Sequence, residues 1–143
     1  MEKAVVVDAS VWVSRLIPSD VNYDASHLWM EQYKTTKKLM VSPAILLIEV
    51  AAAISRQTGR PELAKEAISN LNGLSTIRII PLDDKLLHLS INIAADLQLR
   101  AADAIYVAVA LELNIPLVSW DKEQLRKASG RLTTYTPDTY NGV

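Results

Sequence analysis

The segment Val5-Val6-Val7-Asp8-Ala9-Ser10 joins a short β-branched run directly to an acidic residue. Three consecutive valines indicate a strand that is buried on both faces, as in the centre of a parallel sheet. Asp8 is therefore expected at the carboxyl end of a central strand, the edge at which open α/β sheets bind ligands. A simpler role is equally open, since Asp8 could cap a helix that starts near Ser10.

Short apolar runs of this kind alternate with longer helical patterns along the rest of the chain. Strands are expected at 4–7, 39–41, 77–80, 117–119 and, more weakly, 132–135. Helices are expected at 24–33, 43–58, 61–71, 84–97, 101–113 and 122–129. Regular alternation of the two predicts an α/β fold with a mostly parallel central sheet of four to five strands, covered by helices on both faces.

Several of these helix boundaries have a local physical explanation. Ser42-Pro43 is predicted to be an N-cap followed by proline at the first helical position, where the missing N–H costs nothing. Gly59 is predicted to end that helix. Left-handed terminal residues are expected at Gly73, Gly130 and Asn114.

Length and composition exclude several classes of protein. The 143 residues, half of them apolar, suit a single domain over 1–143, and a net charge of −1 gives no global positive field for nucleic acid. The chain has no cysteine and only two histidines, which excludes disulfides, thiolate zinc sites and cysteine nucleophiles and makes histidine-rich metal sites improbable.

The sequence also predicts a protein of the cytoplasm. Residues 1–7 lack the basic start, long apolar core and cleavage site of a secretory signal. The longest apolar stretch, 43–54, is interrupted at Glu49 and is shorter than the roughly 20 residues that span a bilayer, so no membrane segment is expected.

Glu49 is the most anomalous charge in the sequence, because the predicted helix around it is apolar on every side. A buried carboxylate must be neutral, paired with a cation or bound to a metal. Arg56 and Arg15 are the candidate structural partners. A metal-binding role is favoured, because buried charges are rarely retained for stability alone.

Two further acids occupy comparable positions. Asp103 begins a helix rich in alanine, and small neighbours allow close helix packing, although the helix dipole alone would favour an acid there. Asp121 follows the predicted strand at 117–119 and has Gln124 three residues later, which is the spacing of a capping box. Convergence of Asp8 and these acids in one cleft would require a cation, and an all-oxygen site favours Mg²⁺ or Mn²⁺.

Four segments resemble the motifs of PIN-domain ribonucleases, and most closely those of VapC-type toxins from prokaryotic toxin–antitoxin pairs. These segments are VVVDAS (5–10), LLIEVAAAI (46–54), DAIYVAVA (103–110) and VSWD (118–121). Their order and spacing cover essentially the whole chain. Each segment is weak evidence by itself, and the four together are specific.

The resemblance implies a three-layer α/β/α sandwich in which four acids bind one or two divalent cations and cleave RNA. The acids in this chain would be Asp8, Glu49, Asp103 and Asp121. Ser10 and Ser119 match positions where the family has hydroxyls near the acids. The resemblance further implies a homodimer that is silenced by an antitoxin.

Among the basic residues, Arg15 lies about two helical turns beyond Asp8 and is the first candidate for a contact with substrate phosphate. Phosphatases of the haloacid dehalogenase type need a second aspartate where Ser10 stands, and receiver domains need acid pairs that the sequence lacks. A metal-dependent adhesion module fits Asp8-Ala9-Ser10 until Trp12, and gives Glu49 no role. A noncatalytic binding module, a PIN fold that only binds protein, and a PIN nuclease without an antitoxin are the remaining alternatives.

Overall fold

A five-stranded, wholly parallel sheet with the order β3-β2-β1-β4-β5 forms the centre of the computed structural model, which describes residues 4–142. The strands are β1 (Ala4–Val7), β2 (Leu39–Pro43), β3 (Ile77–Ile80), β4 (Leu117–Val118) and β5 (Thr134–Tyr135). β1 is the middle strand, and its Val6 lies opposite Val41 of β2 and Leu117 of β4. Complete burial of Val5, Val6 and Val7 confirms the interpretation of this run as a central strand.

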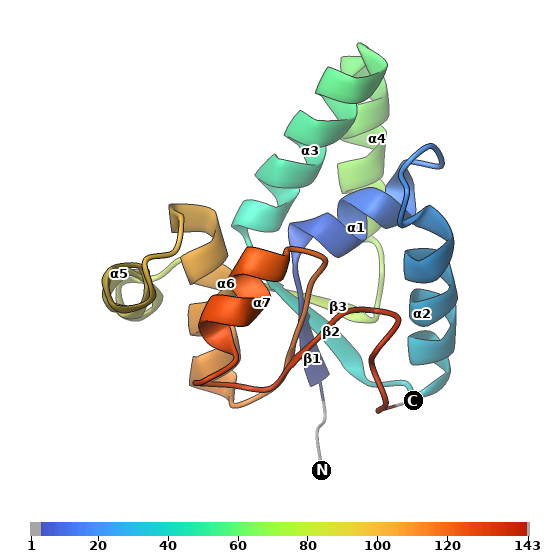
Figure 1. Cartoon of the computed structure of the whole chain (residues 1–143). Helices are drawn as coiled ribbons and strands as arrows, with labels where there is room; N and C mark the ends of the chain where they lie inside the picture. Colours follow the sequence, from blue (N-terminus) through green and yellow to red (C-terminus); the bar gives the residue numbers. More distant parts are fainter. Residues whose placement is uncertain (1–3, 143) are drawn as a thin grey trace.

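Seven helices connect these strands within the described residues. They are α1 (Ala9–Leu16), α2 (Tyr23–Thr35), α3 (Ile45–Thr58), α4 (Pro61–Asn72), α5 (Asp84–Leu97), α6 (Ala101–Leu113) and α7 (Lys122–Ala128). α5, α6 and α7 lie on one side of the sheet, and α1 and α2 lie on the other, while α3 and α4 extend away from it as a pair (Figure 1). The predicted α/β/α architecture is confirmed.

The strand order explains where a ligand site can form. The chain builds outward from β1 through β2 to β3, then crosses to the other side of β1 and continues through β4 to β5. Right-handed crossovers therefore place the early and late helices on opposite faces. The direction changes between β1 and β4, and a crevice opens outside their carboxyl ends at such a switch point.

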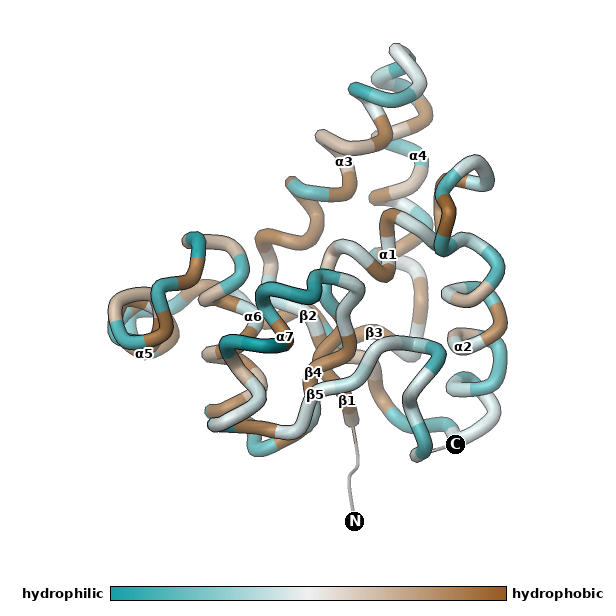
Figure 2. The backbone as a smooth tube through the Cα atoms, in the orientation of Figure 1, coloured by the Kyte–Doolittle hydropathy of each residue, from teal (hydrophilic) through white to brown (hydrophobic). Residues whose placement is uncertain are grey.

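The core is continuous through the sheet and α6. Every residue from Ala104 to Ala110 is buried, which confirms that this apolar segment is a central helix. β1 is among the most hydrophobic segments at the centre of the molecule, whereas α7 begins with a strongly hydrophilic turn (Figure 2). No helix between residues 4 and 142 combines the length and hydropathy needed to cross a membrane.

Most boundaries agree with the sequence, but the predicted helix start at Ser42-Pro43 was wrong. The predicted N-cap at Ser42-Pro43 does not exist, because β2 continues through Pro43 opposite Ile80 and α3 begins at Ile45. The Ser42 hydroxyl instead donates to the Val7 carbonyl. A further helix, Ala9–Leu16, was foreseen only as a start near Ser10.

Of the three predicted left-handed helix ends, only Asn114 was right, and Gly59, predicted only to end its helix, is left-handed as well. Gly59 and Asn114 have φ values of 67° and 52° and end α3 and α6. Gly73 has φ −85°, and the only glycine with positive φ in the described residues is Gly59, so the predictions for Gly73 and Gly130 were wrong. At the C-cap of α4, the Gly73 N–H bonds back to Ser69 and Asn70 with right-handed backbone angles, so glycine's special freedom is not required there.

Candidate active site

Asp8 occupies both of the positions that the sequence left open. It follows β1, and it is also the N-cap of α1, where its Oδ2 accepts a 2.9 Å hydrogen bond from the Ser10 backbone N–H. Its Oδ1 accepts a second bond, of 3.2 Å, from the side-chain amide of Gln124. The residue is only 5% exposed, and burial raises the pKa of its carboxyl group, although hydrogen bonds from the Ser10 backbone, the Ser10 side chain and Gln124 oppose the rise.

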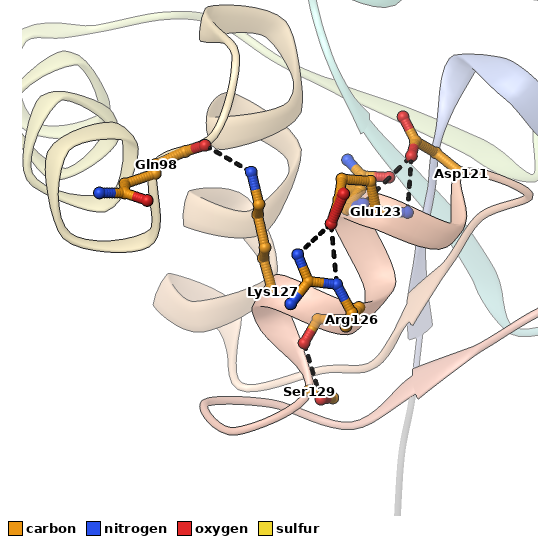
Figure 3. Close-up of polar contacts among 7 residues, drawn as sticks. Gln98, Asp121, Glu123, Arg126, Lys127 and Ser129 are labelled. Atoms are coloured by element: carbon orange, nitrogen blue, oxygen red, sulfur yellow. Dashed lines mark hydrogen bonds and ion pairs between the residues drawn. The ribbon is translucent and has the colours of Figure 1, made fainter.

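Asp121 approaches Asp8 because their strands are neighbours. Val7 pairs with Val118, and the Asp8 N–H donates to the Val118 carbonyl at 3.0 Å. Asp121 is the N-cap of α7, and its Oδ1 accepts from the Glu123 and Gln124 backbone N–H groups (Figure 3). The predicted cap is confirmed.

Two serine hydroxyls fasten the β4–α7 turn to α1. The Ser10 and Ser119 Oγ atoms are 3.3 Å apart, and the Ser10 hydroxyl accepts from the Trp120 N–H. The Ser119 hydroxyl accepts from the Asp121 N–H at 3.0 Å. These hydroxyls therefore hold the backbone that carries Asp8 and Asp121.

Asp103 comes from a separate element, the first turn of α6. It is half-buried, and its carboxylate accepts no hydrogen bond and forms no ion pair among residues 4–142. Burial is the main cause that raises its pKa to about 6, with Asp121 and Asp8 adding repulsion and Arg100 and Lys127 opposing it. An unpaired acid with so high a pKa at a sheet edge is a common feature of functional sites.

Glu49 on α3 is less buried than its apolar surroundings in the sequence suggested. Its side chain is half-buried, and the adjacent Ile48 is 71% exposed, because the outer face of α3 is open in this structure. Neither Arg56 nor Arg15 forms an ion pair with it within the described chain. Its partner is Tyr106, whose hydroxyl donates to Glu49 Oε1 at 2.8 Å.

The four predicted acids act on one another electrostatically. Asp8 and Asp103 both raise the pKa of Glu49, after burial as the main cause. Asp121 raises the pKa of Asp8 and of Asp103. Residues that are far apart in the sequence therefore share one electrostatic environment.

The donor set consists of carboxylate and hydroxyl oxygens, the chemistry that Mg²⁺ and Mn²⁺ favour. The side chains are not assembled into a finished cage, because no three acidic or histidine side chains of the described chain are grouped closely enough to hold one ion. Mutual repulsion of this kind separates carboxylates, and a dication relieves it. The residues therefore fit such an ion by chemistry, and its binding would have to draw them together.

The cations that act on Asp103 are Arg100 and Lys127, whereas the sequence had pointed to Arg15. Arg100 caps α6 and acts on Asp103 together with Lys127, whose ammonium also donates to the Gln98 carbonyl at 2.8 Å (Figure 3). Arg15 lines a cavity of about 170 Å³ between α1, α2 and α4, together with Lys34. Arg15 is not among the charges that shift the pKa of Asp8, Glu49 or Asp103.

Two residues of the site were missed by sequence reasoning. The capping-box spacing predicted that the Gln124 side chain would turn back to the Asp121 N–H, but that N–H bonds to Ser119 and Gln124 points to Asp8. Tyr106 was treated only as part of an apolar helix. Its spacing from Asp103, one turn along α6, was the available signal, since residues three apart share a helix face.

The wholly parallel sheet places the residues that follow β1 and β4 at its switch point. The family comparison is specific: residues 5–130 match the PIN domain, and the chain belongs to that family. No curated protein matches the chain by sequence.

Solved structures with the same fold include several toxins. VapC20 from Mycobacterium tuberculosis, described as a toxin that cleaves the sarcin-ricin loop, has a TM-score of 0.71 at 15% identity over 90% of this chain and 96% of its own. FitAcB from Neisseria gonorrhoeae gives 0.72 at 16% identity, covering 95% and 99%. VapBC2 from Rickettsia felis, bound to a DNA fragment from its promoter, gives 0.69 at 14% identity, covering 92% and 96%. These likenesses show the shared fold.

Proposed function

We propose that this chain, acting as one domain, is a Mg²⁺- or Mn²⁺-dependent endoribonuclease. The observation that carries the proposal is the mutual electrostatic influence of four chain-distant acids at the β1–β4 switch point of a PIN fold. Asp8, Glu49, Asp103 and Asp121 would hold the cation. When bound, such a cation supplies Lewis-acid stabilisation of phosphate charge and a water of lowered pKa.

The protein groups around the acids have separable tasks in this proposal. Asp8 and Asp121 are held rigidly by the caps of α1 and α7, whereas Asp103, with no hydrogen-bond donor in the described chain, is free to turn toward a ligand. Arg100 offers a guanidinium beside Asp103 for an RNA phosphate. Arg15 is proposed to contact an RNA phosphate further from the acids than the phosphate beside Arg100.

The proposed partners are an antitoxin and a second copy of the chain in the cytoplasm. VapBC-1 from Haemophilus influenzae and a toxin–antitoxin complex from Klebsiella pneumoniae share the fold. Large apolar side chains on α3 and α5 are exposed, including Ile48 at 71% and Ile91 at 54%, and exposed apolar surface of this kind favours a protein partner. Sedimentation of the purified chain tests the homodimer, and co-expression with the neighbouring reading frame tests the antitoxin.

The decisive experiment compares wild type with Asp8→Asn on total RNA in Mg²⁺, Mn²⁺ or EDTA, followed by mapping of the cut ends. We expect defined cuts by wild type with either metal, and loss of cutting in EDTA and in the folded variant. A noncatalytic binding module would show no cutting by wild type. Cutting without any associated antitoxin would favour the alternative of a PIN nuclease of RNA processing or turnover.

A further inference from the structure

We propose that Gln124 is a positioning residue of the candidate metal site, whose side-chain amide fixes the Asp8 carboxylate and ties it to the first turn of α6. The inference rests on the proposed function, because it concerns the ability of Asp8 to hold a cation. None of the four family-like segments contains Gln124, which lies three residues beyond the last segment.

The Gln124 amide contacts two separate parts of the site. Its Nε2 donates to Asp8 Oδ1 at 3.2 Å and to the Asp103 backbone carbonyl at 3.3 Å. Both neighbours are acceptors, so the amide must present its N–H groups to them, because the opposite orientation would set oxygen against oxygen. One side chain from α7 therefore joins the residue after β1 to the start of α6.

One polar atom of Gln124 is left unpaired by this arrangement. Gln124 is completely buried, and its Oε1 has no hydrogen-bond donor in the described chain. A buried acceptor without a partner is destabilising, whereas an apolar side chain of the same length would avoid that cost. The polar side chain at this position is therefore explained better by what it does to Asp8 than by its contribution to folding.

Gln124 holds Asp8 from a different element than its other donors. The Ser10 N–H of the N-cap donates to Oδ2, and the Ser10 side chain also hydrogen-bonds to the carboxylate, but both groups belong to one residue two positions along the chain, so neither ties the other oxygen, Oδ1, to a separate element. Gln124 supplies the contact to that other oxygen from a different element. Contacts that orient a metal-ligating side chain typically change metal affinity or activity by about 10–100-fold.

The test uses the full chain with Gln124→Met, which keeps the length and removes both amide groups. Methionine removes the unpaired Oε1 but also leaves Asp8 Oδ1 and the Asp103 carbonyl without this donor, so we expect the urea midpoint in EDTA to stay the same or to fall. Mn²⁺ affinity, measured by titration calorimetry, is expected to fall about 10–100-fold. The kcat on RNA is expected to fall in proportion, while KM changes little.

A matched control is available in Ser90→Ala on α5. Ser90 is also buried, and its hydroxyl likewise has no partner in the described chain, but α5 carries none of the four acids. This variant is expected to keep or gain stability with unchanged Mn²⁺ affinity and kcat.

The outcomes separate this inference from the proposed function. Wild-type Mn²⁺ affinity in Gln124→Met, whatever its stability, overturns the positioning role. Gln124→Leu carries the same expectations and serves if the methionine variant fails to fold. A wild type that neither binds Mn²⁺ nor cuts RNA would defeat the proposed function itself, whereas a wild type that does both beside an unaffected variant defeats only the role of Gln124.

Discussion

The Tyr106 hydroxyl on α6 donates a 2.8 Å hydrogen bond to Glu49 Oε1 on α3, across 57 residues of sequence. This bond joins the helix that carries Asp103 to the helix that carries Glu49. Burial, followed by the charge of Glu49, raises the pKa of Tyr106, so its phenol keeps its proton and remains a donor. The half-buried Glu49 carboxylate is thereby oriented without a cationic partner.

Tyr106→Phe is expected to lower the free energy of unfolding by about 1–2 kcal/mol, since a hydrogen bond to a charged group is lost. The pKa of Glu49 is also expected to rise, because its one side-chain donor disappears. Urea denaturation at pH 7 in EDTA measures the first effect. Tyr23→Phe, on α2, is the matched control, and equal stability of the two variants would contradict a role for the bond.

Glu49→Gln is expected to leave stability unchanged or to raise it by up to about 1 kcal/mol in metal-free buffer. The amide oxygen can still accept from Tyr106, while the repulsion from Asp8 and Asp103 disappears. Equilibrium unfolding in EDTA provides the measurement, with the exposed Glu66→Gln as control. A marked loss of stability would mean that attraction to Tyr106 exceeds the repulsion among the acids.

Stability without metal is expected to increase as the pH falls from 8 to 5. The pKa of Asp103 is raised from 3.8 to about 6, so the folded state binds this proton more tightly than the unfolded state. The stabilising contribution is complete below the unfolded pKa and is lost as pH rises through the folded value. After discounting for solvent screening of this half-exposed group, we expect about 1 kcal/mol.

The pH effect can be assigned by Asp103→Asn, which removes one titrating group. Unfolding in EDTA at pH 5 and pH 8 should differ less for this variant than for wild type. Asp8 and Glu49 have raised pKa values too, so part of the dependence is expected to persist. An identical pH dependence in both proteins would show that Asp103 titrates normally.

Arg100→Ala is expected to raise KM for RNA severalfold and to reduce the salt dependence of binding by about one phosphate contact. Arg100 is the exposed cap of α6 and acts directly on Asp103, whereas Arg15 lies in a cavity between other helices. Arg15→Ala is therefore expected to have the smaller effect. Arg60→Ala is the control, because Arg60 pairs with Glu62 between α3 and α4; an equal effect at Arg60 would indicate only general charge attraction.

The sequence by itself determined where the strands of the sheet lie, where most helices begin and end, and which four acids are candidates for the site. Val5-Val6-Val7 could only be a buried strand, and the limits of α5 and α6 follow from local periodicity and caps, which act over a few residues. Local rules were wrong at Ser42-Pro43, because pairing of β2 with β3 outweighed the helix-start signal. A sheet partner far away in sequence decided that boundary.

Only the tertiary structure decided how the acids are supported. The partner of Glu49 proved to be Tyr106 and not an arginine, and Gln124 turned from its own helix cap to Asp8. Both contacts join segments that are distant in the chain, so no spacing in the sequence encodes them. Their direction depends on how α3, α6 and α7 pack around the ends of β1 and β4, which is a property of the whole fold.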